Sequence, residues 1–337
     1  MKEKVNFDSR WGGEHGIGRF AREIEKRNPD FIRINSRIKP SSPADIFFTT
    51  LYVAFHSGIY FSPGYNAPLF FLKKTILTVH DLNHIDVDHN TSFLKKIYYR
   101  FVLKRACRKS CKIFTVSEFS KKRICEWADI PSSQVDVVGN GVSAEFHSNI
   151  EPHEGNYILV VGNRKRHKNE LRALEAFSNA NLAKDINLYF TGEQSEELDS
   201  YIKNQHLQDR VFFMGRLDNN KLASLYKGAR MLLFPSLYEG FGLPVIEAMA
   251  CGTPVITSNT TSLPEVSGDA AILVNPLNVD EIKEAIESLN CNPELCNKLV
   301  EKGLERAKMF SWENTVERIK NGLEDSIYRS SDIKGRL

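Results

Sequence analysis

Residues 231–256 read MLLFPSLYEGFGLPVIEAMACGTPVI, and this stretch decides the fold. Its opening apolar run, 231–235, predicts a buried strand. A loop containing Gly240 and Gly242 follows, then helix-forming residues from Val245 to Ala250 and a second apolar run. The order strand, glycine loop, helix, strand predicts a βαβ unit. In such a unit, glycines let backbone N–H groups approach a phosphate where the helix begins.

Two carboxylates lie within this stretch, Glu239 in the expected loop and Glu247 in the expected helix. If the segment between them were wholly helical, they would lie about 12 Å apart along the axis. The spacing therefore predicts that the two groups hold opposite ends of an elongated ligand.

The stretch resembles a known family of enzymes. Glu239 and Glu247 match the E-x7-E motif of retaining glycosyltransferases of family 4, in its usual form Glu-Gly-Phe-Gly-Leu-Pro, and residues 262–271 resemble the family's next block. The alternative is a buried helix carrying two solvated glutamates. The resemblance implies an α/β chain of the GT-B fold, with two doubly wound Rossmann-like domains facing a central cleft.

The length of 337 residues is that of about two domains. We expect an acceptor-side domain over 1–150 and a nucleotide-sugar-binding domain over 151–311. The last helix, 312–337, is expected to pack back on the first domain, as the family's last helix does.

The composition is that of an ordinary soluble protein, with 42% hydrophobic and 26% charged residues. A net charge of +3 does not by itself imply nucleic acid, and no nucleic-acid-binding motif is present. The N-terminus lacks an apolar signal region, and no run is long enough to span a membrane. Six cysteines without a C-x-x-C pair favour reduced thiols, so we expect a cytoplasmic protein, peripheral on the inner face of the cytoplasmic membrane.

A glycine loop with Gly16 and Gly18 follows the first expected strand. It only weakly matches a dinucleotide fingerprint, because no βαβ spacing to an acidic partner follows, so a nicotinamide enzyme is a minor alternative. The resemblance implies that the backbone of Gly16 and Gly18 approaches the sugar-phosphate part of the donor. A flexible turn is the alternative.

Further strands are expected at 44–48, 58–63 and 75–79, and the last of them ends at His80. Ligands of open parallel sheets collect at the carboxyl ends of strands. The resemblance implies that His80 faces the donor sugar and the reaction centre. A histidine satisfied within a turn is the alternative.

Histidines and aspartates also gather in 80–89, which raises the alternative of a metal-dependent hydrolase. His80 and His84 have i,i+4 spacing, but no distant ligand pair accompanies them. We expect no metal site, and the resemblance implies a metal-independent enzyme.

The segment 93–123 is rich in Lys and Arg interleaved with aromatic residues. A basic amphipathic helix of this kind suits an anionic membrane surface or a diphosphate-linked lipid, and equally a solvated helix face over a core. Within it, the resemblance implies that Ser117 and Ser120 line the acceptor side.

In the second half, an apolar strand at 157–162 leads into a basic loop with Arg164, Lys165 and Lys168. The resemblance implies that these cations neutralise the diphosphate that leaves, with Arg164 preferred over Lys165 as the partner of Lys168. A solvated basic loop is the alternative. Beyond a later strand at 211–217, the backbone of Arg216 and Leu217 is expected to contact the nucleobase.

The implied reaction is metal-independent transfer of a hexose from a nucleotide diphosphate sugar, with retention of anomeric configuration and no cofactor. Glu247 would bind the ribose, Glu239 the sugar hydroxyls, and the backbone of 240–243 (Gly240, Phe241, Gly242, Leu243) the diphosphate. The relatives resembled are bacterial mannosyltransferases of O-antigen and lipopolysaccharide assembly. They favour GDP-mannose as donor and a glycan or polyprenyl-diphosphate-linked acceptor. A UDP-hexose donor and a non-catalytic nucleotide-sugar-binding subunit are the alternatives.

Overall fold

The computed structural model describes residues 4–13, 16–40, 42–87 and 93–334. The chain divides into two compact units, the first made of 1–141 and 312–337 and the second of 142–311. The division therefore falls at Gly141, whereas the sequence placed it at 150. Val142 already belongs to the second unit, where its N–H donates to the carbonyl of Phe310 at 2.9 Å.

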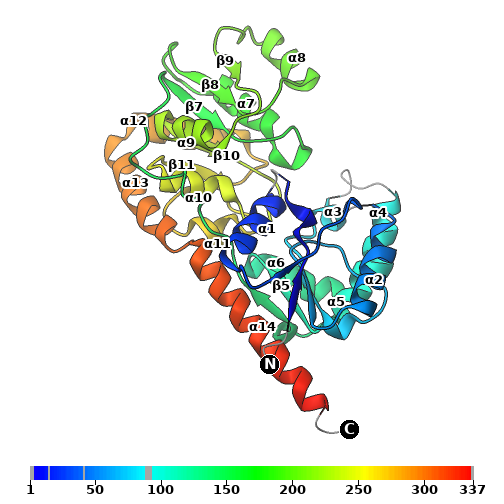
Figure 1. The fold of residues 1–337 in the computed structure, drawn as a ribbon. Helices are drawn as coiled ribbons and strands as arrows, with labels where there is room; N and C mark the ends of the chain where they lie inside the picture. The colour runs from blue at the N-terminus through cyan, green and yellow to red at the C-terminus, as the bar shows by residue number, and fades with distance from the viewer. Residues whose placement is uncertain (1–3, 14–15, 41, 88–92, 335–337) are drawn as a thin grey trace. The chain divides into compact units, whose positions relative to one another are not determined.

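The first unit is built on a parallel sheet in the order β2-β1-β3-β4-β5-β6. Figure 1 labels β5 of this sheet and several of the helices around it. Its strands are β1 (Val5–Phe7), β2 (Ile32–Arg33), β3 (Ile59–Ser62), β4 (Thr75–Thr78), β5 (Lys112–Thr115) and β6 (Val135–Val137). Its helices are α1 (Gly16–Arg27), α2 (Asp45–Phe55), α3 (Asn83–Asp86), α4 (Phe93–Ile97), a π-helical segment (Tyr98–Leu103), α5 (Lys104–Lys109), α6 (Glu118–Ala128) and α14 (Trp312–Lys334). Short 3-10 turns lie at Ser9–Trp11, Leu72–Lys74 and Ser132–Gln134.

Both faces of this sheet are buried, as in other parallel sheets. Because successive side chains of a strand point to opposite faces, neighbouring residues of β4 pack on different sides of the sheet. Ile76 packs with α1 and α14, where Trp312 is 1% exposed, and Leu77 packs against the helices between 99 and 128. The last helix is thus part of the core of the first unit.

One predicted strand is wrong: residues 44–48 lie in the turn before α2 and in α2 itself, which is a helix. Its buried residues, Asp45, Thr49 and Val53, recur every four positions, which is the period of a helix face. The run Ile46-Phe47-Phe48 is apolar on both faces of that helix, so it resembles a buried strand when read locally.

The basic segment 93–123 spans several elements. α4, the π-helical segment and α5 cover Phe93–Lys109, β5 follows as a fully buried strand, and α6 begins only at Glu118. The cations of this segment therefore lie on separate elements.

The second unit has its own parallel sheet, in the order β12-β11-β10-β7-β8-β9. Its strands are β7 (Tyr157–Val160), β8 (Asn187–Phe190), β9 (Val211–Phe213), β10 (Met231–Phe234), β11 (Val255–Ser258) and β12 (Ile272–Val274). Its helices are α7 (Glu170–Asn179), α8 (Glu196–Asn204), α9 (Asn219–Gly228), α10 (Leu243–Ala250), α11 (Leu263–Ser267), α12 (Val279–Cys291) and α13 (Pro293–Lys308), with a 3-10 turn at Arg166–Lys168. The βαβ unit predicted from residues 231–256 is present as β10, α10 and β11.

Candidate active site

The strand order of the second sheet reverses between β7 and β10. β7 pairs with β10 on one side and with β8 on the other, all in parallel. In open parallel sheets, ligands bind at such a switch point, beyond the carboxyl ends of the strands. Lys168 follows β7 and Glu239 follows β10, so the topology brings these two residues to the same place.

There, Lys168 and Glu239 form an ion pair. Lys168 Nζ lies 2.6 Å from Glu239 Oε1, and the side chains are 14% and 13% exposed. The hydroxyl of Ser236 donates to the same carboxylate oxygen at 2.7 Å, and Lys168 Nζ lies 5.0 Å from the centre of the Phe234 ring. A cation and a carboxylate that keep some exposure can exchange their partner for a ligand.

The two loops that carry the pair are tied to each other. The N–H of Leu237 donates to the carbonyl of His167 at 2.7 Å, and Ser236 Oγ lies 2.8 Å from the same carbonyl oxygen. Asn169, in the left-handed conformation with φ 59°, donates from Nδ2 to the carbonyl of Pro235 at 2.9 Å. The pair is therefore held by fixed backbone, as a pre-organised site requires.

The glycine loop leads directly into α10. Gly242 has φ 104°, and a Cβ there would lie 2.6 Å from Leu263 Cδ2, so glycine is required. Ser262 Oγ lies 2.9 Å from the carbonyl oxygens of both Glu239 and Phe241, so its hydroxyl holds the loop by a hydrogen bond to either one. α10 begins at Leu243. Its N-terminus favours an anion because the helix dipole and backbone N–H groups point toward it.

Glu247 lies one helical turn further along α10, where it is 3% exposed. The hydroxyl of Tyr226, on α9, donates to Glu247 Oε2 at 3.0 Å. The sequence did not single out Tyr226, because the helical pattern around it predicts only a core position.

The side chain of Arg164 forms an ion pair and hydrogen bonds within the second unit. Its guanidinium pairs with Glu170, donates from Nε to the carbonyl of Glu193 at 2.5 Å and from Nη2 to the carbonyl of Thr191 at 2.7 Å. Burial raises the pKa of Glu170, and the nearby charge of Arg164 opposes this shift. A contact of Arg164 with a diphosphate would require these bonds to exchange, and it stays a prediction. Lys165 is exposed.

The predicted nucleobase contacts lie after β9. Gly215 has φ 62°, and its carbonyl accepts a hydrogen bond from the N–H of Gly192 at 2.8 Å, which joins the exits of β8 and β9. Arg216 is exposed and Leu217 half-buried just beyond this link. A base contact at these residues stays a prediction.

In the first unit, His80 follows β4 and is 8% exposed. Its Nε2 lies 2.8 Å from the carbonyl oxygen of Pro63, and its ring meets the Phe20 ring edge to face with the centroids 5.0 Å apart. Imidazole with one nitrogen hydrogen-bonded to a carbonyl has a fixed tautomer and orientation. This fixed ring suits a group that orients a ligand.

Ser117 and Ser120 are 0% and 1% exposed. Ser117 Oγ accepts the N–H of Ser120 and caps α6, while Ser120 Oγ donates to the carbonyl of His80 at 2.9 Å. Both hydroxyls thus support the backbone around His80, and their predicted contact with an acceptor stays a prediction.

Gly16 is exposed at the start of α1, and Gly18 is buried two residues further along the helix. A Cβ on Gly18 would lie within 1.8 Å of the carbonyl oxygen of Gly13. Glycine at 18 is therefore explained by packing of the loop on the helix, and a donor contact of Gly16 and Gly18 stays a prediction.

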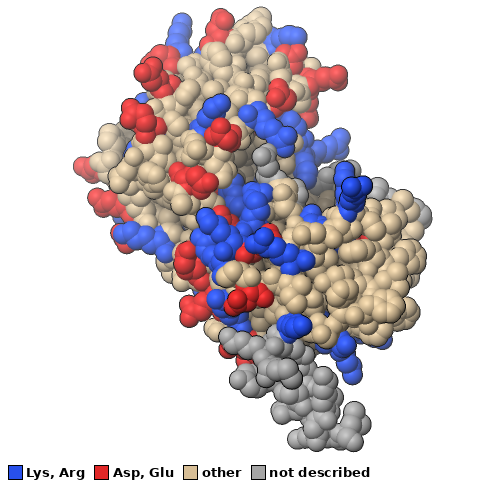
Figure 2. Space-filling view, viewed as in Figure 1, with Lys and Arg blue, Asp and Glu red and all other residues tan. Residues whose placement is uncertain are grey.

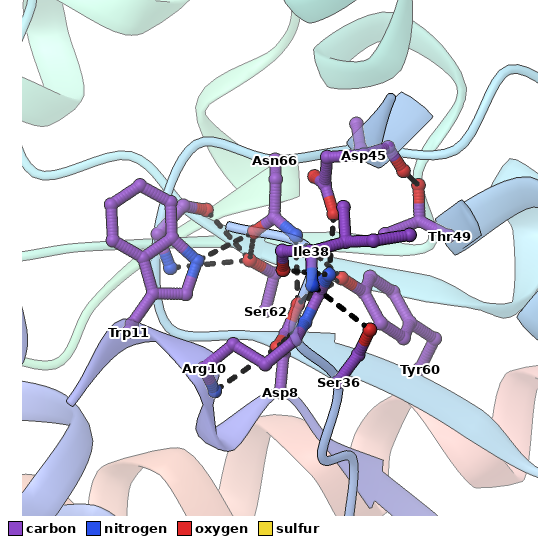
Figure 3. Close-up of polar contacts among 12 residues, drawn as sticks. Asp8, Arg10, Trp11, Ser36, Ile38, Asp45, Thr49, Tyr60, Ser62 and Asn66 are labelled. Atoms are coloured by element: carbon purple, nitrogen blue, oxygen red, sulfur yellow. Dashed lines mark hydrogen bonds and ion pairs between the residues drawn. The ribbon is translucent and has the colours of Figure 1, made fainter. Parts of the chain in front are cut away.

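A buried polar network that the sequence did not reveal occupies the switch point of the first sheet, between β1 and β3 (Figure 3). Arg10 pairs with Asp8 at 2.5 Å and with Asp45 at 2.6 Å. Tyr60 Oη and Asn66 Nδ2 both donate to Asp8, each at 2.7 Å. Burial, with a smaller contribution from Asp8, raises the pKa of Asp45 to about 6, although Arg10 opposes the shift.

The described residues contain no cluster of three or more side chains able to hold a metal ion. His89 and Asp88 of the histidine-rich segment lie outside the described residues. Within the same described ranges, no helix combines the length and apolar character that crossing a membrane requires.

Solved structures match this architecture. Sucrose-phosphate synthase from Thermosynechococcus elongatus matches with a TM-score of 0.78 at 17% identity, covering 98% of this chain and 100% of that one. WaaG, a glycosyltransferase involved in lipopolysaccharide biosynthesis, matches with a TM-score of 0.75 at 15% identity, covering 94% and 98%. The fold is therefore that of the GT-B glycosyltransferases.

Sequence comparisons agree with the fold. The family model of glycosyl transferases group 1 matches residues 142–306, and that of glycosyltransferase family 4 matches 51–146. O-antigen chain mannosyltransferase RfbU from Salmonella typhimurium is 30% identical over 261 residues, which cover 76% of this chain and 70% of that protein. O-antigen chain mannosyltransferase B from Escherichia coli is 28% identical over 280 residues, covering 78% and 73%. The chain belongs to glycosyltransferase family 4, and it is a glycosyltransferase.

Proposed function

We propose that this enzyme transfers mannose from GDP-mannose, with retention of anomeric configuration and without a metal, to a glycan acceptor in surface polysaccharide assembly. The observation that carries the proposal is the Lys168–Glu239 pair, held at 2.6 Å beside the start of α10. The names of the O-antigen mannosyltransferase relatives support mannose as the sugar and a glycan as the acceptor.

Each group would have a separate role in the reaction. Lys168 and the N-terminus of α10 would stabilise the diphosphate as its bond to the anomeric carbon breaks. Glu239, released from Lys168, would accept hydrogen bonds from the sugar hydroxyls. Glu247 would exchange its bond with Tyr226 for the ribose hydroxyls, and His80 would orient the sugar.

The bond changes balance without a covalent enzyme intermediate. The acceptor oxygen would attack the anomeric carbon on the face from which the diphosphate departs, and the proton of that oxygen would pass to the leaving phosphate. No cofactor is needed, because the donor already carries the sugar in activated form.

We further propose that the acceptor is a polyprenyl-diphosphate-linked glycan at the inner face of the cytoplasmic membrane. All six cysteines are free thiols, which suits the reducing cytoplasm. A UDP-hexose donor is the second candidate, favoured by one observation: the fold neighbour HepE from Anabaena was solved in complex with UDP and glucose.

The test is a transfer assay with purified protein in EDTA. GDP-mannose, UDP-glucose and UDP-N-acetylglucosamine are offered separately with a short synthetic mannoside, and the anomeric signal of the product is read by NMR. We expect an α-linked mannoside from GDP-mannose alone, and no product from the Glu239→Ala variant, which should keep its melting temperature. An inverted product, a product only when metal is added, or normal turnover by Glu239→Ala would overturn the proposal. A protein that binds donor but transfers nothing to any mannoside, soluble or polyprenyl-diphosphate-linked, would be a binding subunit.

A further inference from the structure

Exposed apolar side chains concentrate on one part of the first unit. Among the described residues, eight of the twelve exposed large apolar side chains lie on three neighbouring segments. These eight, which we call the apolar face, are Phe47, Leu51 and Phe55 of α2, Phe70 and Phe71 of the loop that follows β3, and Leu94, Ile97 and Phe101 of the helical segment 93–109.

On α2 the apolar face is a continuous stripe. Phe47, Leu51 and Phe55 are 66%, 58% and 82% exposed and recur every four residues. They lie on the side of α2 opposite the buried residues Thr49 and Val53. A helix that carries an apolar stripe on its solvent side lacks a partner for that side.

Hydrogen bonds fix the three segments next to one another. Thr50 on α2 accepts the N–H of Leu69 at 2.8 Å, and Arg105 on α5 donates to the carbonyl of the same Leu69. Tyr98 accepts the N–H of Ala67 at 3.2 Å and donates to the carbonyl of Tyr65 at 2.8 Å. The loop with Phe70 and Phe71 is therefore clamped between α2 and the helical segment, and the apolar face is one surface.

The exposed charges on the segments that carry the apolar face have a single sign. Residues 46–80 and 93–117 contain no Asp or Glu. Exposed cations lie at Lys73, Lys74, Lys95, Lys96 and Arg100. Figure 2 shows a broad uncharged face over α2 and α5, with Lys and Arg at its margins. Soluble monomers rarely expose an apolar patch of more than a few hundred Å² unless it binds something.

We infer that the apolar face docks the enzyme on an anionic lipid bilayer, with the stripe of α2 inserted among the headgroups and the cations against lipid phosphates. Apolar insertion combined with a cationic margin is how interfacial helices bind such surfaces. A second copy of this chain fits less well, because pairing the face with itself would bring cations against cations. The inference rests on the proposed function only for placing the acceptor at a membrane.

The test is co-sedimentation of the full chain with vesicles, without donor or acceptor. The vesicles are either phosphatidylcholine alone or an equal mixture of phosphatidylcholine and phosphatidylglycerol. We expect binding to the anionic vesicles only, weakened by salt, and at least a ~10-fold lower partition for Phe47→Ser/Leu51→Ser/Phe55→Ser.

The matched control is Phe212→Ser/Leu277→Ser, which removes apolar side chains that are 41% and 62% exposed in the second unit. It should bind anionic vesicles as the wild type does, and both variants should keep the wild-type melting temperature because the changed side chains are exposed.

Equal binding by the α2 variant, or no binding of the wild type to anionic vesicles, would overturn the inference. A dimer seen by sedimentation velocity and abolished by the α2 variant would assign the face to a second copy instead. Transfer to a soluble mannoside, measured in parallel, reports on the proposed function separately: it should be unchanged in the α2 variant.

Discussion

The Lys168–Glu239 pair makes a prediction about ligand exchange. If the diphosphate replaces Glu239 as the partner of Lys168, neutralising Lys168 and neutralising Glu239 should change the affinity for GDP in different ways. Lys168→Met removes the cation that binds GDP, whereas Glu239→Gln removes only the anion that competes for it.

The magnitudes follow from the geometry. A hydrogen bond to a charged group is worth ~1.5–3 kcal/mol, so Lys168→Met should weaken GDP binding by roughly 10- to 150-fold. At 2.6 Å the Lys168–Glu239 pair has a large Coulomb energy, but both side chains are only 13–14% exposed, so the cost of removing the two charges from water offsets most of it. Removing this competitor in Glu239→Gln should leave GDP affinity unchanged or raise it by up to about 5-fold, or ~1 kcal/mol.

The assay is isothermal titration with GDP in EDTA, followed by the transfer assay. Arg166→Met is the control, because it removes an exposed cation two positions away and reports the long-range effect of charge alone. Glu239→Gln should bind GDP yet lose transfer. If Glu239→Gln weakens GDP binding as much as Lys168→Met does, the pair holds the loops together and is not exchanged for ligand.

Three further outcomes are expected. Gly18→Ala should lower the melting temperature by several degrees, at a cost of ~2–3 kcal/mol, because its Cβ would meet the carbonyl of Gly13 at 1.8 Å; an unchanged melt would contradict this packing. Tyr226→Phe should cost ~1–3 kcal/mol in denaturant unfolding, since it removes the hydroxyl that donates to buried Glu247; a loss below measurement error would mean that other partners suffice. The pKa of Asp45, about 6 against an ordinary 3.8, is raised in the folded state, so its protonation stabilises the fold at low pH and that contribution is lost as pH rises through 4–6. It amounts to at most ~3 kcal/mol, and Asp45→Asn should flatten the urea midpoints measured across that range; an identical pH profile in the variant would refute the assignment.

Much of the fold was predictable because its strands are short, apolar and bounded by turn residues. The stretch 231–256 predicted β10, the glycine loop, α10 and β11, since each has a local signal. α2 could not be read in the same way. Its exposed stripe is apolar (Phe47, Leu51, Phe55), whereas two of its buried residues, Asp45 and Thr49, are polar, so the helical period is visible only when burial is known.

The sequence named candidate site residues, whose roles stay predictions, and it did not show the contacts between them. Lys168 and Glu239 lie on loops after strands that become neighbours only in the folded sheet, and their pairing follows from the strand order. Tyr226 reaches Glu247 from another helix, and Arg10 meets Asp45 across the sheet edge; no local spacing encodes either contact. The hydrogen bonds and the ion pair of Arg164 could not be predicted from the sequence for the same reason.

The most direct test of the central claim is a thermal-shift panel in EDTA with GDP, GDP-mannose, UDP and UDP-glucose. A ligand that binds only the native state raises the melting temperature by mass action. The account predicts a rise with GDP and GDP-mannose, and none with the UDP compounds. A rise with UDP compounds alone would contradict the proposed donor, and no rise with any nucleotide would contradict the nucleotide-sugar site itself.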